Sequence, residues 1–103
     1  MEREVYIITR DEFREDGNDF TTLCIHETLK GAIAHFNQIV ADERADYMYN
    51  QTGSIDTSAE AMEQAGVEEA FKTDPDGTMS WHIWLPLSWD ELFIHIFRKE
   101  LLD

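Results

Sequence analysis

The stretch TMSWHIWLPLSWDELFIHIFRKELL, residues 78–102, carries the densest apolar side-chain mass in this 103-residue chain. It contains all three tryptophans, two of the six phenylalanines and two of the four histidines. Burial of large apolar side chains is the dominant favourable term in folding. We therefore expect the core to form around this stretch.

The first part of this stretch alternates as a β-strand does. One predicted face is apolar and carries Met79, Trp81, Ile83 and Leu85. The other face carries Ser80, His82 and Trp84, because residues two apart share a face of a strand. Pro86 is expected to end the strand, since proline has no N–H to donate to a ladder.

Residues 88–102 fit two structures. Ser88–Glu91 matches the capping box that begins many helices. Leu92–Phe97 is rich in strand formers and places Leu92, Ile94 and Ile96 on one face. As a helix, these six residues would be apolar on nearly all sides. We favour the strand, and the helix remains the alternative.

The N-terminal part predicts a β-hairpin. Its strands are expected at Glu4–Arg10 and Phe20–Glu27, joined by an acidic connection at Asp11–Asp19. Gly17 and Asn18 supply the residues of a tight turn. One face of the second strand would carry Phe20, Thr22, Cys24 and His26.

The middle of the chain predicts one long helix. Thr28 is a favourable N-cap, and the helix is expected to run from about Leu29 to Tyr49. Its apolar residues recur at helical spacing and form a stripe that can pack on a sheet. These are Leu29, Ala32, Ile33, Phe36, Ile39, Val40, Tyr47 and Met48.

A short helix and a further strand complete the pattern. The helix is expected to begin at the capping box Thr57–Glu60 and to end at Gly66. A strand at Glu69–Thr73 would then pair with Met79–Leu85. The order β-β-α-α-β-β-β predicts a single α+β domain over residues 1–103, with an antiparallel sheet of four to five strands and one long amphipathic helix packed on one face.

The charge excludes several functions. The chain has 22 acids and 8 bases, a net charge of −14. Direct binding to nucleic acid or to an anionic membrane needs patches of lysine and arginine, so we expect neither. The apolar runs are too short to span a bilayer, no signal peptide is expected, and Cys24 is the single cysteine. The expected compartment is the cytoplasm.

The residue types that carry catalysis form no recognisable pattern. His82 and His95 would lie on adjacent strands near Asp90 or Glu91, with His26 close by on the hairpin. Their spacing matches no metal motif, so we expect half-buried strand residues and no metal. A metal-dependent or small-molecule-binding domain remains a third hypothesis, which rests on His82 and His95 alone. Cys24 is expected to act as a small apolar residue. The glycines are scattered singly, which leaves no phosphate loop, and we expect neither a cofactor nor an enzyme.

The acids are unevenly distributed. Residues 42–76 contain ten acids and two bases, and a second group surrounds Arg14. Asp42, Glu43 and Asp46 would span about 6 Å of helix axis. Duplex DNA carries one charge per ~1.7 Å of axis. The spacing is compatible with imitation of a phosphate backbone, although adaptation to high salt would give the same charge.

Our leading hypothesis is a small acidic protein that occupies a basic, nucleic-acid-binding surface of a partner protein. Nuclease inhibitors, toxin-immunity proteins and phage anti-defence proteins, anti-CRISPR types among them, share this physical logic. The candidate contacts are Asp42, Glu43, Asp46, Tyr47, Tyr49, Asp56, Glu60, Glu63, Glu68 and Glu69.

The alternative hypothesis is a structural or homo-oligomeric adaptor. Its apolar interface would lie on a sheet face that no helix of this chain covers. Trp84, Trp89, Phe93 and Phe97 exceed what one face of a small sheet needs, and a homodimer packed sheet to sheet, or strand edge to edge, would provide a cover.

Overall fold

The computed structural model describes residues 2–86, 88 and 90–102. Five antiparallel strands form one sheet in the order β2-β1-β5-β4-β3. The strands are β1 (Glu2–Arg14), β2 (Gly17–His26), β3 (Glu68–Thr73), β4 (Met79–Trp84) and β5 (Glu91–Leu102). The helices are α1 (Leu29–Thr52) and α2 (Ala59–Ala65). The predicted α+β class and element order are confirmed.

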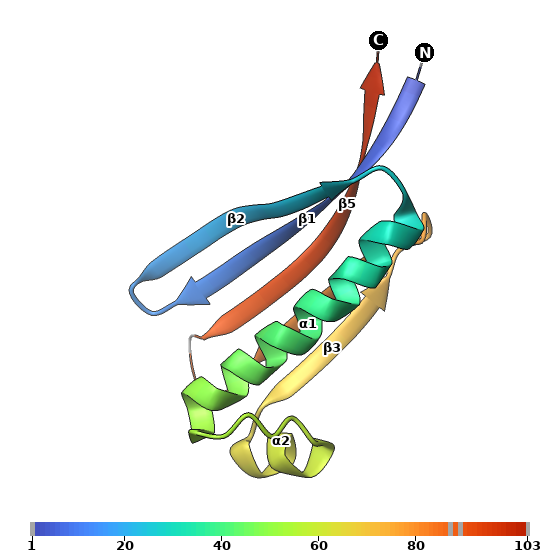
Figure 1. The fold of residues 1–103 in the computed structure, drawn as a ribbon. Coiled ribbons are helices and arrows are strands. Elements are labelled where there is room, and N and C mark those ends of the chain that lie inside the picture. The colour runs from blue at the N-terminus through green and yellow to red at the C-terminus, as the bar shows by residue number, and fades with distance from the viewer. Residues whose placement is uncertain (1, 87, 89, 103) are drawn as a thin grey trace.

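The helix α1 crosses one face of the sheet (Figure 1). The N-terminal end of β1 and the C-terminal end of β5 project together beyond the rest of the molecule, whereas α2 lies at the opposite end, below the C-terminus of α1. The molecule is elongated, with extents of 51 × 28 × 21 Å. Neither helix in the described part of the chain has an apolar stretch long enough to cross a bilayer.

The last strand, β5, occupies the centre of the sheet. Leu92, Ile94 and Ile96 are buried on the face beneath α1, as the alternation of the sequence predicts. The alternative of a helix here is wrong. The Ser88 hydroxyl accepts a hydrogen bond from the Asp90 N–H at 3.1 Å, and β5 begins at the next residue.

The tryptophan strand β4 is also confirmed. Trp81 and Ile83 are fully buried, whereas His82 on the opposite face is half-buried. The strand pairs with β3 in the expected antiparallel sense, with Thr73 opposite Met79. The acidic turn between them is closed by Thr78, whose hydroxyl donates to carboxylate oxygens of Asp74 and Asp76.

The long helix supplies the other half of the core. The Thr28 hydroxyl caps its N-terminus by accepting a hydrogen bond from the Gly31 N–H at 3.1 Å. The helix ends at Thr52, three residues beyond the predicted Tyr49, and Gly53 caps it in the left-handed conformation at φ 77°. The buried residues of α1 are Ala32, Phe36, Val40, Tyr47 and Met48.

The hairpin is longer than predicted. Residues 11–14 and 17–19, expected in a connection, continue the two strands, and Arg14 pairs with Gly17 across a turn at Glu15 and Asp16. The prediction was wrong because acidic residues disfavour strands, whereas here Arg14 forms ion pairs with carboxylates on both strands. Gly17 does adopt a positive φ of 149°.

The short helix begins one residue later than predicted. Ser58, not Thr57, is the N-cap, and its hydroxyl accepts a hydrogen bond from the Ala61 N–H at 3.1 Å. The predicted end is confirmed, since Gly66 at φ 72° caps the C-terminus. Two adjacent hydroxyl residues can both serve as a cap, and the sequence pattern alone favoured the first.

Substitution of Phe36 tests the packing of α1 on the sheet. Phe36 is fully buried, so Phe36→Ala should lower the free energy of unfolding by about 3–5 kcal/mol. Phe20 is 62% exposed, so Phe20→Ala serves as the control and should cost less than about 1 kcal/mol. Urea denaturation of both variants measures the difference, and equal losses would contradict the proposed core.

Candidate functional site

The carboxylates of this protein lie at its surface. Among the side chains that the structure describes, no aspartate or glutamate is buried. Between Gly53 and Phe71 the sequence has five acids and neither lysine nor arginine. The exposed members of this group are Asp56, Glu60, Glu63 and Glu68. We refer to these four residues as the α2 acidic cluster, and they give this end of the molecule a negative field.

Local contacts fix the backbone that carries the α2 acidic cluster. The Asp56 carboxylate accepts a hydrogen bond from the Ser58 N–H at 2.9 Å, and this contact lowers the pKa of Asp56. Met62 is buried and anchors α2 to the core. The carboxylates are therefore presented by a capped segment that is anchored to the core.

Apolar and acidic residues share an open groove between α2 and the start of β3. Its lining residues are Ala59, Met62, Glu63, Gly66, Val67, Glu68, Glu69 and Pro86. Complementary charge speeds the encounter of two proteins, and well-packed apolar contacts carry most of the binding energy. The groove offers both kinds of contact to a protein partner.

Glu69, a predicted contact residue, is engaged inside the fold. Its carboxylate accepts hydrogen bonds from the Arg44 Nε at 2.9 Å and from the Trp81 Nε1 at 2.8 Å. The Arg44 guanidinium lies 5.8 Å from the ring centroid of Trp81. Glu69 therefore links β3 to α1 and β4, and its replacement would disturb the fold as well as the surface.

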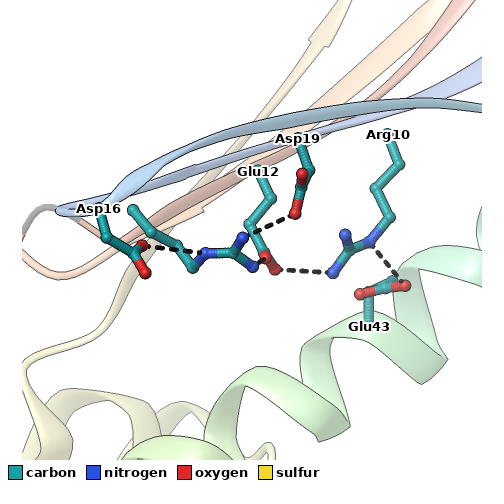
Figure 2. A network of polar contacts seen from close by, with 6 residues as sticks. Arg10, Glu12, Asp16, Asp19 and Glu43 are labelled. Atoms are coloured by element: carbon teal, nitrogen blue, oxygen red, sulfur yellow. Dashed lines mark hydrogen bonds and ion pairs between the residues drawn. The ribbon is translucent and has the colours of Figure 1, made fainter.

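A second acidic region forms where α1 faces the hairpin (Figure 2). The Glu43 carboxylate accepts a hydrogen bond from Arg10 Nε at 3.1 Å, and Arg10 Nη2 also donates to Glu12 at 2.8 Å. Arg14 is the second cation of this network, and its partners are Glu12, Asp16 and Asp19. Two guanidinium groups thus neutralise part of the charge of four carboxylates.

The predicted contact residues fall on two flanks of α1. Glu43 faces β1 through Arg10, whereas Arg44 faces β3 through Glu69. The strands β1 and β3 lie on opposite sides of the β5–β4 pair. Asp42 and Asp46 are exposed, and Asp46 lines a groove together with Arg10 and Glu43 on the β1 flank. They do not form one surface with the α2 acidic cluster.

The two predicted tyrosine anchors occupy different environments. Tyr49 is 57% exposed, whereas Tyr47 is 8% exposed and its hydroxyl donates to the Asp90 backbone oxygen at 2.9 Å. Burial, together with the nearby charges of Asp90 and Glu91, raises the pKa of Tyr47 to about 12. Tyr47 is therefore a core residue, and Tyr49 is the tyrosine that is accessible to a partner.

The face of the sheet opposite α1 carries an aromatic row. The ring of His82 stacks on Phe93 at a centroid distance of 3.9 Å and on Trp84 at 4.3 Å. Phe13 contacts Phe93 edge-on at 5.7 Å. His95 packs against Phe97 on the same face. Trp89 lies outside the described residues.

The predicted metal candidates on this face remain half-buried strand residues. His82 Nε2 lies 3.7 Å from a Glu91 carboxylate oxygen, and His95 Nε2 lies 3.8 Å from Asp74. Burial lowers the pKa of His82, and the charge of Glu91 opposes that shift. The expectation that His26 lies close to them is wrong, because His26 points to the α1 side of the sheet, where it contacts His35.

A different group of ligand types is brought together by the fold. Among the described residues, Cys24, His26 and His35 place one potential metal-ligating atom each within 4.8 Å of the others. Sequence reasoning placed Cys24 and His26 on one strand face but missed His35, which lies on α1. The missing information was the packing of α1 on β2.

The chain matches no protein-family model, no curated protein and no solved structure with which it was compared. Functional inference for this protein therefore rests on its own residues and their arrangement.

The buried tyrosine gives a test of this geometry in alkaline solution. The pKa of Tyr47 is about 12 in the folded chain and about 10 in the unfolded chain, so its stabilising contribution is complete below pH 10 and is lost as pH rises through 12. Urea denaturation at increasing pH should show that the free energy of unfolding declines between about pH 10 and pH 12. Tyr47→Phe should make this decline smaller. The exposed Tyr49→Phe is the control and should leave the decline unchanged; an equal decline in Tyr47→Phe would contradict the assignment.

Proposed function

We propose that this protein is a small, acidic, non-enzymatic binding protein that occupies a basic, nucleic-acid-binding surface of a partner protein. The α2 acidic cluster carries the proposal, because the segment that presents it has no lysine or arginine. A surface that binds phosphates through lysine and arginine is complementary to such a group of carboxylates. The protein would then act as an inhibitor, an immunity protein or an anti-defence protein of the phage type.

The arrangement of the acids supports a division of roles. The α2 acidic cluster would make the charged contacts, and the groove beside Met62 and Val67 would receive an apolar side chain of the partner. Glu43 and Glu69 are held by Arg10 and Arg44, so they would act by holding the surrounding surface in place. Asp42, Asp46 and Tyr49 would contact a partner large enough to reach around α1.

Competition with nucleic acid tests the proposed binding mode. The immobilised protein would be incubated at low salt with a nuclease-treated cell lysate and washed, and duplex DNA or RNA would then be added. Release of the bound protein by nucleic acid, at an ionic strength that does not itself cause release, is the expected result. Bound protein that resists nucleic acid and leaves only with high salt would contradict the proposal.

Charge reversal at two positions tests the surface itself. Glu63 and Glu68 are both exposed, so Glu63→Lys/Glu68→Lys should leave the melting temperature almost unchanged. We expect it to weaken binding by about 100-fold, because like charges across an interface cost several kcal/mol. The matched control is Glu15→Lys/Glu100→Lys, which changes the net charge equally at exposed sites elsewhere. Equal weakening by both variants would indicate a non-specific charge effect.

A second candidate function rests on the sheet face opposite α1. Among the described residues, three large apolar side chains of this face are well exposed, those of Phe20 and Ile25 at 62% each and of Phe97 at 43%. An apolar face of this kind favours a partner that covers it. We propose a second copy of the chain as the occupant, because a two-fold axis would place the aromatic centre of this face against itself, and this apolar contact would have to outweigh the repulsion between two acidic molecules.

Molar mass measured at several protein concentrations tests self-association. Light scattering should show a mass that rises toward that of a dimer as the concentration increases. Phe97→Asp should give a monomer at the same concentrations, since the two-fold axis of a homodimer brings like charges together. The exposed Ile55→Asp, outside the sheet, is the control. A monomeric mass for the unmodified chain at every concentration would exclude this function.

A further inference from the structure

Three metal-ligating side chains meet between β2 and α1. The Cys24 Sγ lies 3.3 Å from the His35 Nδ1, and the His26 Nε2 lies 2.8 Å from the same His35 nitrogen. Cys24 and His26 are half-buried, and His35 is exposed. The site is therefore partly enclosed by protein and open to solvent on one side.

Two features of the chain create this meeting. Cys24 and His26 are two residues apart on β2 and share the face toward α1. A β-bulge lies directly before Cys24 in β2, since Ile8 pairs with Cys24 but Thr9 pairs with Thr22. Gly31 lies in the first turn of α1, and a Cβ at this position would be 3.7 Å from His26 Nδ1 and 3.0 Å from the Thr28 hydroxyl oxygen. The distance to His26 is an ordinary van der Waals contact, so the first turn of α1 lies directly against β2, whereas the close contact is with the N-cap hydroxyl.

We propose that Cys24, His26 and His35 form a Zn²⁺ site, with water as the fourth ligand. A thiolate and two imidazoles are ligand types that zinc prefers, and three protein ligands with one open position make a complete tetrahedral set. A copper or nickel ion would bind the same donors, but zinc tolerates this tetrahedral arrangement without a geometric preference of its own.

The observed spacing is close to that of a tetrahedral site. Zn–N bonds of about 2.05 Å and a Zn–S bond of about 2.3 Å separate neighbouring ligand atoms by about 3.3 Å for N···N and about 3.6 Å for S···N. The two contacts of His35 Nδ1 in the structure are 2.8 Å to nitrogen and 3.3 Å to sulfur, and the ligand atoms of Cys24 and His26 lie within 4.8 Å of each other. Small rotations about the side-chain bonds would open the two contacts of His35 by the required few tenths of an ångström.

Binding would exchange protons for the metal. Zinc binds cysteine as the thiolate, and burial raises the pKa of the Cys24 thiol, which works against metal binding. Zinc binding breaks the S–H bond, forms the S–Zn bond and releases the proton to solvent. The two imidazoles bind through lone pairs on His26 Nε2 and His35 Nδ1, which leaves the N–H of each ring on its other nitrogen.

The surroundings of the site favour a cation. An open groove beside it is lined by Leu23, His35, Ile39, Asp42 and Glu43. The exposed carboxylate of Asp42 raises the local concentration of cations, whereas Glu43 is paired with Arg10. A bound ion would tie β2, an edge strand of the sheet, to α1. This site lies at the β2 edge, whereas the α2 acidic cluster lies near β3, so the two proposals are independent of each other.

Titration with Co²⁺ in place of Zn²⁺ tests the site directly. The full-length protein, freed of metal with a chelator, should develop a thiolate-to-cobalt charge-transfer band and the intense visible bands of tetrahedral cobalt. Equimolar Zn²⁺ should remove both. Metal binding should also raise the melting temperature, because the ion stabilises the folded chain only.

Substitutions assign the bands to the three residues. Cys24→Ser should abolish the charge-transfer band. His35→Gln, at an exposed position, should weaken metal affinity by about 100-fold or more, because loss of a direct ligand should cost at least as much as the largest effects seen for residues that only contact a ligand. The matched control His95→Gln, on the opposite sheet face, should leave both signals unchanged. Absence of the charge-transfer band in the unmodified protein, or full metal affinity in His35→Gln, would overturn the proposal.

Discussion

The pairing of β5 with β1 joins the two halves of the sheet. The β1–β2 and β3–β4 hairpins are local in sequence, whereas the β5–β1 ladder runs from Glu2 opposite Leu102 to Phe13 opposite Glu91. The central strand of the sheet is thus the last strand in the sequence. The core beneath α1 is incomplete without Ile94 and Ile96 of this strand. Such long-range pairing slows folding, because the loop-closure entropy is lost before the contacts form. It also fixes the distance between the two edges of the sheet, where the proposed sites lie.

The single long helix gives the sheet two different faces. Under α1, Trp81 and Ile83 are fully buried, whereas the neighbouring His82 and Trp84 on the other face are only half-buried. The aromatic row on that face gains stacking energy within the chain, since rings at these distances attract beyond their buried area. The negative charge elsewhere opposes non-specific association of this exposed apolar face.

The sequence predicts the elements better than their contacts. The structure confirms the strand predicted from the alternation of Met79–Leu85 and the helix predicted from the apolar stripe between Ala32 and Met48. In both elements the spacing of the apolar residues depends on which face is buried. The hairpin length was wrong because strand propensity omits ion pairs such as Arg14–Asp19, which form only after the strands pair. The approach of His35 to Cys24 depends on a bulge and on helix packing, neither of which has a signal in local periodicity.

The distribution of ion pairs bears on why the chain is so acidic. Adaptation to salt requires acids on the whole surface, and it sets no condition on where the bases lie. Here Arg10 and Arg14 form ion pairs with carboxylates at the hairpin. Arg44, on α1, forms an ion pair with Glu69 of β3. The α2 acidic cluster has no base in its own segment, although one lysine among four carboxylates would relieve their repulsion. Repulsion left in place beside a groove that apolar and acidic residues share is a cost to folding, and the proposed binding to a basic partner would recover that cost.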